Sequence, residues 1–245
     1  MIFVRSLLFN VFEFITVMIA ATLLLVTFWA PPRFRHGVCR AWCSLMVWAV
    51  DFFCGIKTVV EGAENVPDTP SVVLIKHTST LETLWQVSFF PQTVWVVKRE
   101  ILFAPVFGWA IGLALDPIAI DRKASGSAVK QVIRQGRDKL RQGIWVTVFP
   151  EGTRMAPGKT RTYGTSGAAL ARDANVPIVP VAHNAGDFWG RRSFNKRPGT
   201  VRFVIGPPID AANRPAKETN LIVQDWIEST MREISVYYQQ HNNSQ

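Results

Sequence analysis

A histidine followed five positions later by a carboxylate is the first pair in this sequence that could do chemistry. His77 directly follows the predicted strand 72–76, and Glu82 stands near the start of a helical pattern. Five positions on a regular helix separate two side chains by about 140°, so the pair can meet only if His77 lies just before the helix. A carboxylate bonded to one ring nitrogen would fix the tautomer and leave the other nitrogen free to accept a proton. The pair therefore has the composition of a general base.

Glu82 also has a purely structural interpretation. Ser79-x-x-Glu82 matches a capping box, in which the glutamate bonds back to the amide at the start of the helix. A lone histidine is more often a structural residue than a catalyst. On this segment alone, capping and catalysis both remain open.

The segment 149–154, Phe-Pro-Glu-Gly-Thr-Arg, is a second candidate for chemistry. It follows the apolar run 144–149, so a strand delivers it to an edge of the fold. Gly152 lets the backbone approach a ligand closely, and Arg154 can grip a phosphate through two parallel hydrogen bonds. An ordinary turn with a Glu151–Arg154 ion pair is the alternative. The segment predicts a turn that holds a phosphate group.

The elements that must position these residues are strands alternating with helices. Short β-rich runs occupy 72–76, 94–97, 118–120, 144–149, 178–182 and 201–205. Most of them are continuously apolar, which is typical of strands covered on both faces. Helical periods separate them, including 124–142 and 217–238. We predict an α/β fold with a central, mostly parallel or mixed sheet flanked by helices. The basic stripe of the helix 124–142 is either a solvated face or a contact for acidic headgroups; it comprises Lys130, Arg134, Arg137 and Arg141.

The first 56 residues form an apolar appendage. An apolar run reaches from about residue 7 to 30, Pro31-Pro32 ends it, and a shorter run follows at 41–56. Two membrane-spanning helices would have to bury both Glu13 and Asp51, which is costly. We therefore favour a helical hairpin inserted in one leaflet over a true span, and bulky Phe28-Trp29 argues against a cleaved signal peptide. We divide the chain into this hairpin (1–56), an α/β domain (57–238) and a disordered tail (239–245).

The composition points to an anionic lipid partner. Lys and Arg total 27 against 18 Asp and Glu, a net charge of +9. Nine Trp and sixteen Phe favour lipid over nucleic acid, and no nucleic-acid motif is recognisable. The three cysteines have no partners at metal-ligand spacing. We expect reduced thiols, no metal and no cofactor.

Four motifs in order resemble those of the glycerolipid acyltransferases, and most closely those of the bacterial 1-acyl-sn-glycerol-3-phosphate acyltransferases. They are His77 with Glu82, then Lys98-Arg99-Glu100 with Pro105 and Gly108, then 149–154, and finally the run 176–182. The resemblance covers about residues 57–210, and an amphipathic N-terminal hairpin is typical of the bacterial members. The family usually has Asp where this chain has Glu82, a departure of one methylene in the partner of His77.

The resemblance implies a reaction and its parts. His77 would deprotonate the free sn-2 hydroxyl of a lysophosphatidate, which attacks an acyl thioester to give phosphatidic acid, and Glu82 would orient His77. The residues implied to hold the acceptor phosphate are Glu151, Gly152, Thr153, Arg154, Lys98, Arg99 and Arg122, and Pro180 would belong to the acyl or acceptor pocket. The co-substrate would be acyl-CoA or acyl carrier protein. The location would be the bacterial inner membrane, with the active site facing the cytoplasm.

Three other functions stay in view. Another lysolipid acceptor, such as a lyso-aminolipid or a different lysophospholipid, would use the same motifs. A membrane-bound serine esterase would need a Gly-x-Ser-x-Gly elbow, which the sequence lacks. A non-enzymatic phospholipid binder would leave His77 with Glu82 unexplained.

Overall fold

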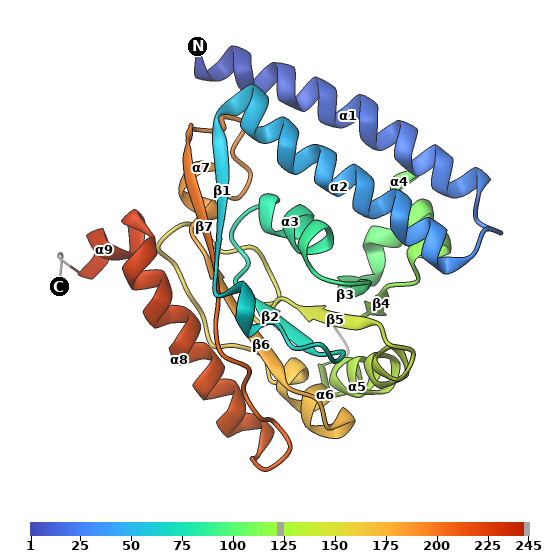
Figure 1. Ribbon diagram of the computed structural model, residues 1–245, viewed down its shortest axis with the longest axis vertical. Coiled ribbons are helices and arrows are strands. Elements are labelled where there is room, and N and C mark those ends of the chain that lie inside the picture. Colours follow the sequence, from blue (N-terminus) through green and yellow to red (C-terminus); the bar gives the residue numbers. More distant parts are fainter. Residues whose placement is uncertain (122–124, 243–245) are drawn as a thin grey trace.

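A single mixed sheet positions the rest of the chain. The computed structural model describes residues 1–121 and 125–242, and within them the strands form one seven-stranded sheet in the order β1-β7-β6-β2-β5-β3-β4 (Figure 1). Strands β2 to β6 run parallel, β1 pairs parallel with β7, and β7 is antiparallel to β6. The strands are β1 (Ile56–Glu61), β2 (Val72–Ile75), β3 (Thr93–Lys98), β4 (Ile118–Ile120), β5 (Trp145–Val148), β6 (Ile178–His183) and β7 (Gly199–Ile205). The predicted α/β class is confirmed.

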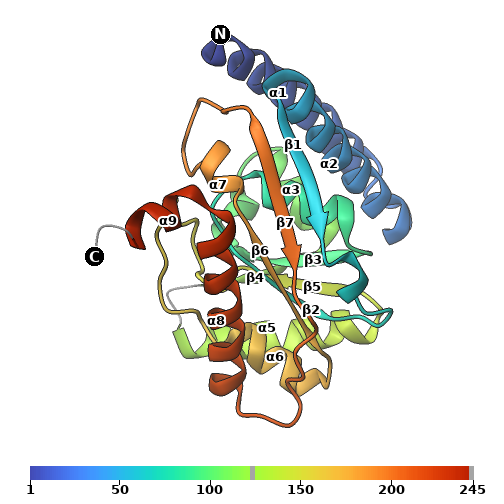
Figure 2. The same cartoon turned by 60° about the vertical axis from the view of Figure 1, so that its left-hand side comes forward.

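Helices cover both faces of this sheet (Figure 2). One layer contains α1 (Ile2–Val26), α2 (Pro32–Cys54) and α3 (Leu81–Phe89), and the other contains α5 (Ser125–Arg141), α6 (Ser166–Ala174) and α8 (Ala216–Ile234). The shorter helices are α4 (Phe107–Ala110), α7 (Ala185–Phe188) and α9 (Val236–Asn242), with single turns at Ala63–Asn65, Arg99–Phe103 and Ile111–Leu115.

The continuously apolar strands divide their side chains between these two layers. In β2, Val73 and Ile75 join the core beneath α2 and α3, whereas Val72 and Leu74 join the core beneath α5, α6 and α8. All four are fully buried. Alternation sends successive side chains to opposite faces, and each such burial stabilises the fold by roughly 1.5–3 kcal/mol.

The N-terminal hairpin docks on the domain through the polar residues of α1. The buried Lys196 donates from Nζ to Asn10 Oδ1 at 2.6 Å, and its backbone N–H donates to Ser6 Oγ at 2.9 Å. Glu13 lines a groove between the hairpin and the domain, whereas Asp51 is exposed. A span would therefore place Asp51, rather than Glu13, on the outer face of the hairpin against lipid. Both helices are long and apolar enough to cross a membrane.

Two stretches differ from the prediction. Strand β1, which lies across the expected 56/57 boundary, was not predicted, because as an edge strand it has only one fully buried residue, Ile56. The expected single helix 217–238 breaks at Ser235, whose hydroxyl donates to Asp187 Oδ1 while the amide of Val236 donates to Asp187 Oδ2. Within the expected tail 239–245, α9 continues through Asn242, and 243–245 lie outside the described residues.

Candidate active site

The candidate site lies at the carboxyl edge of the parallel strands. His77 follows β2, Phe149 follows β5, and these strands are adjacent and parallel in the sheet. β3 ends at Lys98 on the other side of β5. Loops that leave parallel strands at the same edge bring together residues far apart in sequence, and ligand sites of α/β proteins gather there.

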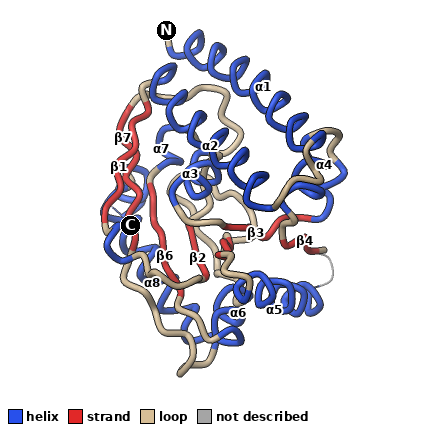
Figure 3. The backbone as a smooth tube through the Cα atoms, turned by 45° about the vertical axis from the view of Figure 1, so that its right-hand side comes forward, coloured by secondary structure: helices blue, strands red, loops and turns tan. Residues whose placement is uncertain are grey.

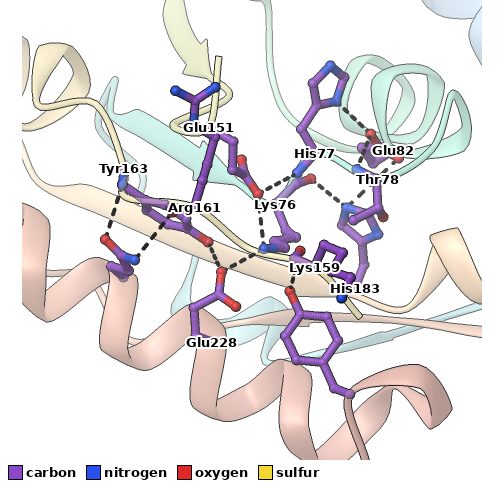
Figure 4. Close-up of polar contacts among 12 residues, drawn as sticks. Lys76, His77, Thr78, Glu82, Glu151, Lys159, Arg161, Tyr163, His183 and Glu228 are labelled. Carbon is purple, nitrogen blue, oxygen red and sulfur yellow. Dashed lines mark hydrogen bonds and ion pairs between the residues drawn. The ribbon is translucent and has the colours of Figure 1, made fainter. Parts of the chain in front are cut away.

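His77 and Glu82 are in direct contact. The imidazole Nδ1 lies 2.8 Å from Glu82 Oε1, and α3 begins only at Leu81, so His77 stands before the helix as the spacing required. Glu82 is fully buried, and the His77 side chain is 15% exposed. Figure 4 shows the second ring nitrogen pointing away from Glu82. A carboxylate can only accept here, so Nδ1 carries the proton and Nε2 keeps its lone pair.

One oxygen of Glu82 also caps the helix. Besides the imidazole, Glu82 Oε1 accepts from the amides of Ser79 at 3.0 Å and Thr78 at 3.2 Å. Capping and orientation of His77 are therefore simultaneous, and the choice left open by the sequence does not arise. Burial alone would raise the pKa of Glu82, but the hydrogen bond from His77 and those from the backbone together hold it below its usual value. The carboxylate is thus ionised at neutral pH.

The loop after β5 fixes the backbone of His77. The amide of His77 donates to Glu151 Oε1 at 3.3 Å, and its carbonyl oxygen accepts from the amide of Met155 at 2.7 Å. The ring of Phe149 stacks on the imidazole with centroids 4.0 Å apart. Gly152, at φ 67° in the same turn, adopts a left-handed conformation that favours glycine. The first and third motifs therefore form one unit.

A buried charge network lies on the other side of this strand end (Figure 4). Lys76 Nζ, with no exposed surface, is 2.6 Å from Glu228 Oε1 and 3.2 Å from Glu151 Oε1. The Tyr163 hydroxyl donates to Glu228 Oε1 at 2.6 Å. Burial raises the pKa of Glu151, and the charge of Lys76 opposes that rise. Glu151, predicted to bind phosphate, pairs with Lys76 through its carboxylate and accepts from the amide of His77.

His183 at the end of β6 completes the support. Its Nε2 lies 2.6 Å from the carbonyl oxygen of Lys76, and its Nδ1 accepts from the amide of Ala185 at 3.3 Å. This pattern requires the proton on Nε2, so His183 donates to the backbone next to His77. Burial lowers the pKa of His183 and keeps the ring neutral.

Two cavities meet beside His77. A polar cavity of about 550 Å³ is lined by His77, Lys98, Gly152, Arg154 and Arg161, among others. An apolar groove of about 620 Å³ runs between α1, α2 and α3 and the segment 105–115. Thr83, Trp95 and Arg154 line both. A ligand with a charged head and an apolar tail can therefore place its head beside Arg154 and its tail in the groove.

The other predicted site residues are distributed unevenly around this site. Thr153 stands between Gly152 and Arg154 in the turn, but Arg99 is exposed and does not line the polar cavity. Arg122 lies outside the described residues. Pro180, expected in an acyl or acceptor pocket, lies within β6 opposite Leu74 and away from both cavities, because its strand position turns it towards the core beneath α8.

Sequence reasoning missed several residues around the site. Arg161 lines the polar cavity, and Figure 4 shows it on the same side of the strand end as His77. Glu228 could have been found from α8, where it stands beside Ile227 on the buried face. Arg161 gave no comparable signal, since it lies in a loop without periodicity. Within 1–121 and 125–242 no group of three or more His, Cys, Asp and Glu residues could hold a metal ion.

A family model described as Acyltransferase matches residues 57–184. A 1-acyl-sn-glycerol-3-phosphate acyltransferase of Pseudomonas aeruginosa is 43% identical over 206 residues, which cover 83% of this chain and 79% of the relative. The human 1-acyl-sn-glycerol-3-phosphate acyltransferase alpha is 34% identical over 67% of this chain and 59% of its own length. The crystal structure of the 1-acyl-sn-glycerophosphate acyltransferase PlsC of Thermotoga maritima superposes with a TM-score of 0.77 over 94% of both chains at 20% identity, which establishes likeness of fold.

Proposed function

The chain belongs to the acyltransferase family, and on that premise we propose that it acylates the sn-2 hydroxyl of 1-acyl-glycerol-3-phosphate. The acyl donor is a thioester of coenzyme A or of acyl carrier protein, and the product is phosphatidic acid. One observation carries the proposal: His77, held by Glu82, and Arg154 line the same cavity. The reacting hydroxyl and the phosphate of one acceptor can be held there together. Two relatives at 43% and 34% identity are named for this acceptor, which supports the choice.

The contacts of His77 support its role as the general base. Nε2 takes the proton of the acceptor hydroxyl while the hydroxyl oxygen forms a bond to the thioester carbonyl carbon. The tetrahedral intermediate then breaks its carbon–sulfur bond, and the imidazolium returns the proton to the departing thiolate. The products are the ester and a free thiol. Glu82, ionised and bonded to Nδ1, stabilises the imidazolium between these two steps.

The acceptor is held by its charge and by its chain. Arg154 stands where the polar cavity joins the apolar groove, and Lys98 and the Gly152 turn line the polar side. A phosphate there makes charge-assisted hydrogen bonds to Arg154. The groove beside it accepts an acyl chain, because its lining is mostly apolar.

The exposed apolar surface of the hairpin supports the proposal that the protein acts at a membrane. The outer faces of α1 and α2 expose large apolar side chains such as Phe14, Ile19, Trp48 and Phe52. We expect the hairpin to lie in one leaflet, as the exposed Asp51 favours. Thioester donors are soluble in the cytoplasm, so we expect the cytoplasmic face of the bacterial inner membrane.

An acceptor panel tests this function. Purified protein in detergent, one labelled acyl thioester and equal amounts of lysophosphatidate, a lyso-aminolipid and larger-headgroup lysophospholipids are compared by product formation. We expect lysophosphatidate to be used best. Preference for an acceptor without a terminal phosphate would refute the assignment, and release of free fatty acid would indicate an esterase.

Arg154→Ala tests how the phosphate is held. Loss of a charge-assisted hydrogen bond is worth about 1.5–3 kcal/mol, so kcat/KM for lysophosphatidate should fall by roughly 10- to 100-fold. Arg172→Ala, at an exposed position of α6, serves as the control and should retain wild-type kinetics. An unchanged kcat/KM in Arg154→Ala would remove Arg154 from the binding site.

A further inference from the structure

Residues 101–115 form an apolar segment in the middle of the α/β domain. Apart from the indole N–H of Trp109, no side chain in this segment is polar, while Lys98, Arg99 and Glu100 precede it and Asp116 follows it. The segment folds as α4 between the single turns Arg99–Phe103 and Ile111–Leu115. In the proposed reaction, only those residues of the segment that line the groove have a role.

Only one face of this segment packs on the protein. Ala110, Ile111 and Leu115 are buried, with 2%, 7% and 5% of their surfaces exposed. The outward face is also apolar, and it comprises Ile101, Phe103, Phe107, Trp109 and Leu113, which are 40% to 70% exposed. Soluble monomers rarely leave so many contiguous large apolar side chains in water, so this face marks an interaction surface.

The segment lies beside the hairpin, although about 50 residues of sequence or more separate them (Figure 3). Ala110 shares a small apolar cluster with Ala21 and Leu24 of α1. Arg35 Nη1, at the start of α2, donates to the carbonyl oxygen of Leu113 at 2.9 Å. The outward face of the segment is therefore held next to the exposed apolar surface of the hairpin, which includes Trp29 at 75% and Phe28 at 59%.

Cationic side chains border this combined surface. Arg33 is exposed in the first turn of α2, and Arg99 is exposed just before the segment begins. An apolar surface with basic residues at its margin is complementary to a bilayer that contains anionic phospholipid, since the rings enter the acyl layer while the cations meet the headgroups.

The same segment forms one wall of the apolar groove. Phe107, Ile111 and Leu115 line the groove opposite Val17 and Leu24 of α1. The groove leads to Arg154 and Thr83, which also line the polar cavity with His77. An acyl chain that entered between α1 and this segment would reach the site without crossing water.

We propose that residues 101–115 are a third membrane-inserting element beside the two hairpin helices, and that an acyl chain passes laterally from the bilayer into the groove between this segment and α1. The occupant of the surface is the acyl layer of a bilayer containing anionic phospholipid. Lateral entry rests on the proposed function, whereas insertion can be measured without catalysis.

Insertion is tested by fluorescence quenching in vesicles of phosphatidylethanolamine and phosphatidylglycerol. Single cysteines replace Phe103 or Trp109, are labelled with a polarity-sensitive fluorophore and are quenched by lipids that carry nitroxide in the acyl chain. Trp48→Cys in the hairpin is the positive control, and Leu221→Cys, 56% exposed on α8, is the negative control. Wild-type protein gives the labelling blank, because Cys39, Cys43 and Cys54 are buried.

We expect probes at 103 and 109 to be quenched as strongly as the probe at 48, and the probe at 221 to respond to aqueous iodide instead. If the probes at 103 and 109 behave like the probe at 221, insertion is refuted. If their environment depends on the protein-to-lipid ratio and not on the nitroxide, a second copy of the chain covers the face, which also overturns the proposal.

Lateral entry is tested with the double variant Phe103→Gln/Trp109→Gln, since neither side chain lines the groove. Loss of two inserted aromatic rings should weaken vesicle binding about tenfold or more, and turnover of a vesicle-embedded acceptor should fall with it. Turnover of a short-chain, water-soluble acceptor should stay within about twofold, as should both activities of Leu221→Gln. Equal losses on both acceptors would overturn lateral entry, whereas failure of the wild-type protein to acylate either acceptor would refute the proposed function and leave the quenching result standing.

Discussion

Lys76 and His77 are neighbours in sequence but belong to opposite sides of the same strand end. Lys76 is fully buried and ion-paired with Glu151 and Glu228. His77 has one nitrogen committed to Glu82 and lines a cavity. The buried side holds Lys76 between two carboxylates, whereas the open side keeps one imidazole nitrogen available. The buried ion pairs therefore fix the strand end that carries His77, and substitutions on either side test this division.

His77→Ala is expected to have the largest effect, mainly on activity. Loss of a general base lowers kcat by roughly 10²- to 10⁴-fold. Buried Glu82 loses one hydrogen bond but keeps those from the amides of Ser79 and Thr78, so the free energy of unfolding should fall by about 1–3 kcal/mol, less than for the Lys76 variant. His36→Ala, in the hairpin, controls for loss of an imidazole elsewhere. A stability loss as large as that of the Lys76 variant below would contradict the division between the two sides.

Lys76→Met is expected to act on stability first. Removing the lysine leaves the carboxylates of Glu151 and Glu228 buried without their cation, which costs about 3–5 kcal/mol of unfolding free energy. Chemical denaturation of the detergent-solubilised protein measures this. Lys130→Met, at an exposed position of α5, should change stability by less than about 0.5 kcal/mol.

A second substitution sharpens this test. Lys76→Met combined with Glu228→Gln removes one of the two uncompensated charges and should recover part of the lost stability. If the double variant is no more stable than Lys76→Met alone, the stability lost in Lys76→Met does not come from unpaired charge on Glu228.

Glu82→Gln is expected to show a smaller loss that depends on pH. The pKa of Glu82 is lower in the folded protein than its ordinary value of 4.5, so the ionised carboxylate contributes stability above that value. This contribution disappears as pH falls through the lower folded pKa. The stability difference between wild type and Glu82→Gln should therefore be largest near neutral pH and shrink in acid. A difference that grows in acid would mean that the folded pKa is raised.

Gly152→Ala is expected to have the smallest effect of the four. Gly152 has φ 67° and open space around the position of an added Cβ, so the penalty is conformational, about 1 kcal/mol. A shift of this turn should lower activity modestly through the Met155–His77 hydrogen bond. Gly37→Ala, within helix α2 where an added Cβ also meets nothing, should not destabilise the protein.

Much of the site could be predicted because its signals are local. The contact between His77 and Glu82 follows from a strand that ends just before a helix begins, and both elements were visible as patterns of apolar residues. The turn at 149–154 was marked by its glycine and by the apolar strand before it. The strands β2, β5 and β6 were recognisable because strands buried on both faces are almost continuously apolar, whereas β7 was marked by β-rich residues although it alternates in burial. Strand β1 escaped because an edge strand lacks that pattern.

The sequence by itself determined the order of the motifs, the strand-to-helix junction at His77 and the apolar character of the hairpin, since each depends on residues within a few positions of one another. Only the tertiary structure decided that Lys76 meets Glu228, that Lys196 meets α1, and that Glu151 supports His77 while Pro180 lies away from both cavities. The physical reason is that the order of strands in a sheet and the packing of helices on it set which distant residues become neighbours. Local periodicity gives the face on which a side chain stands, but not the partner that it finds there.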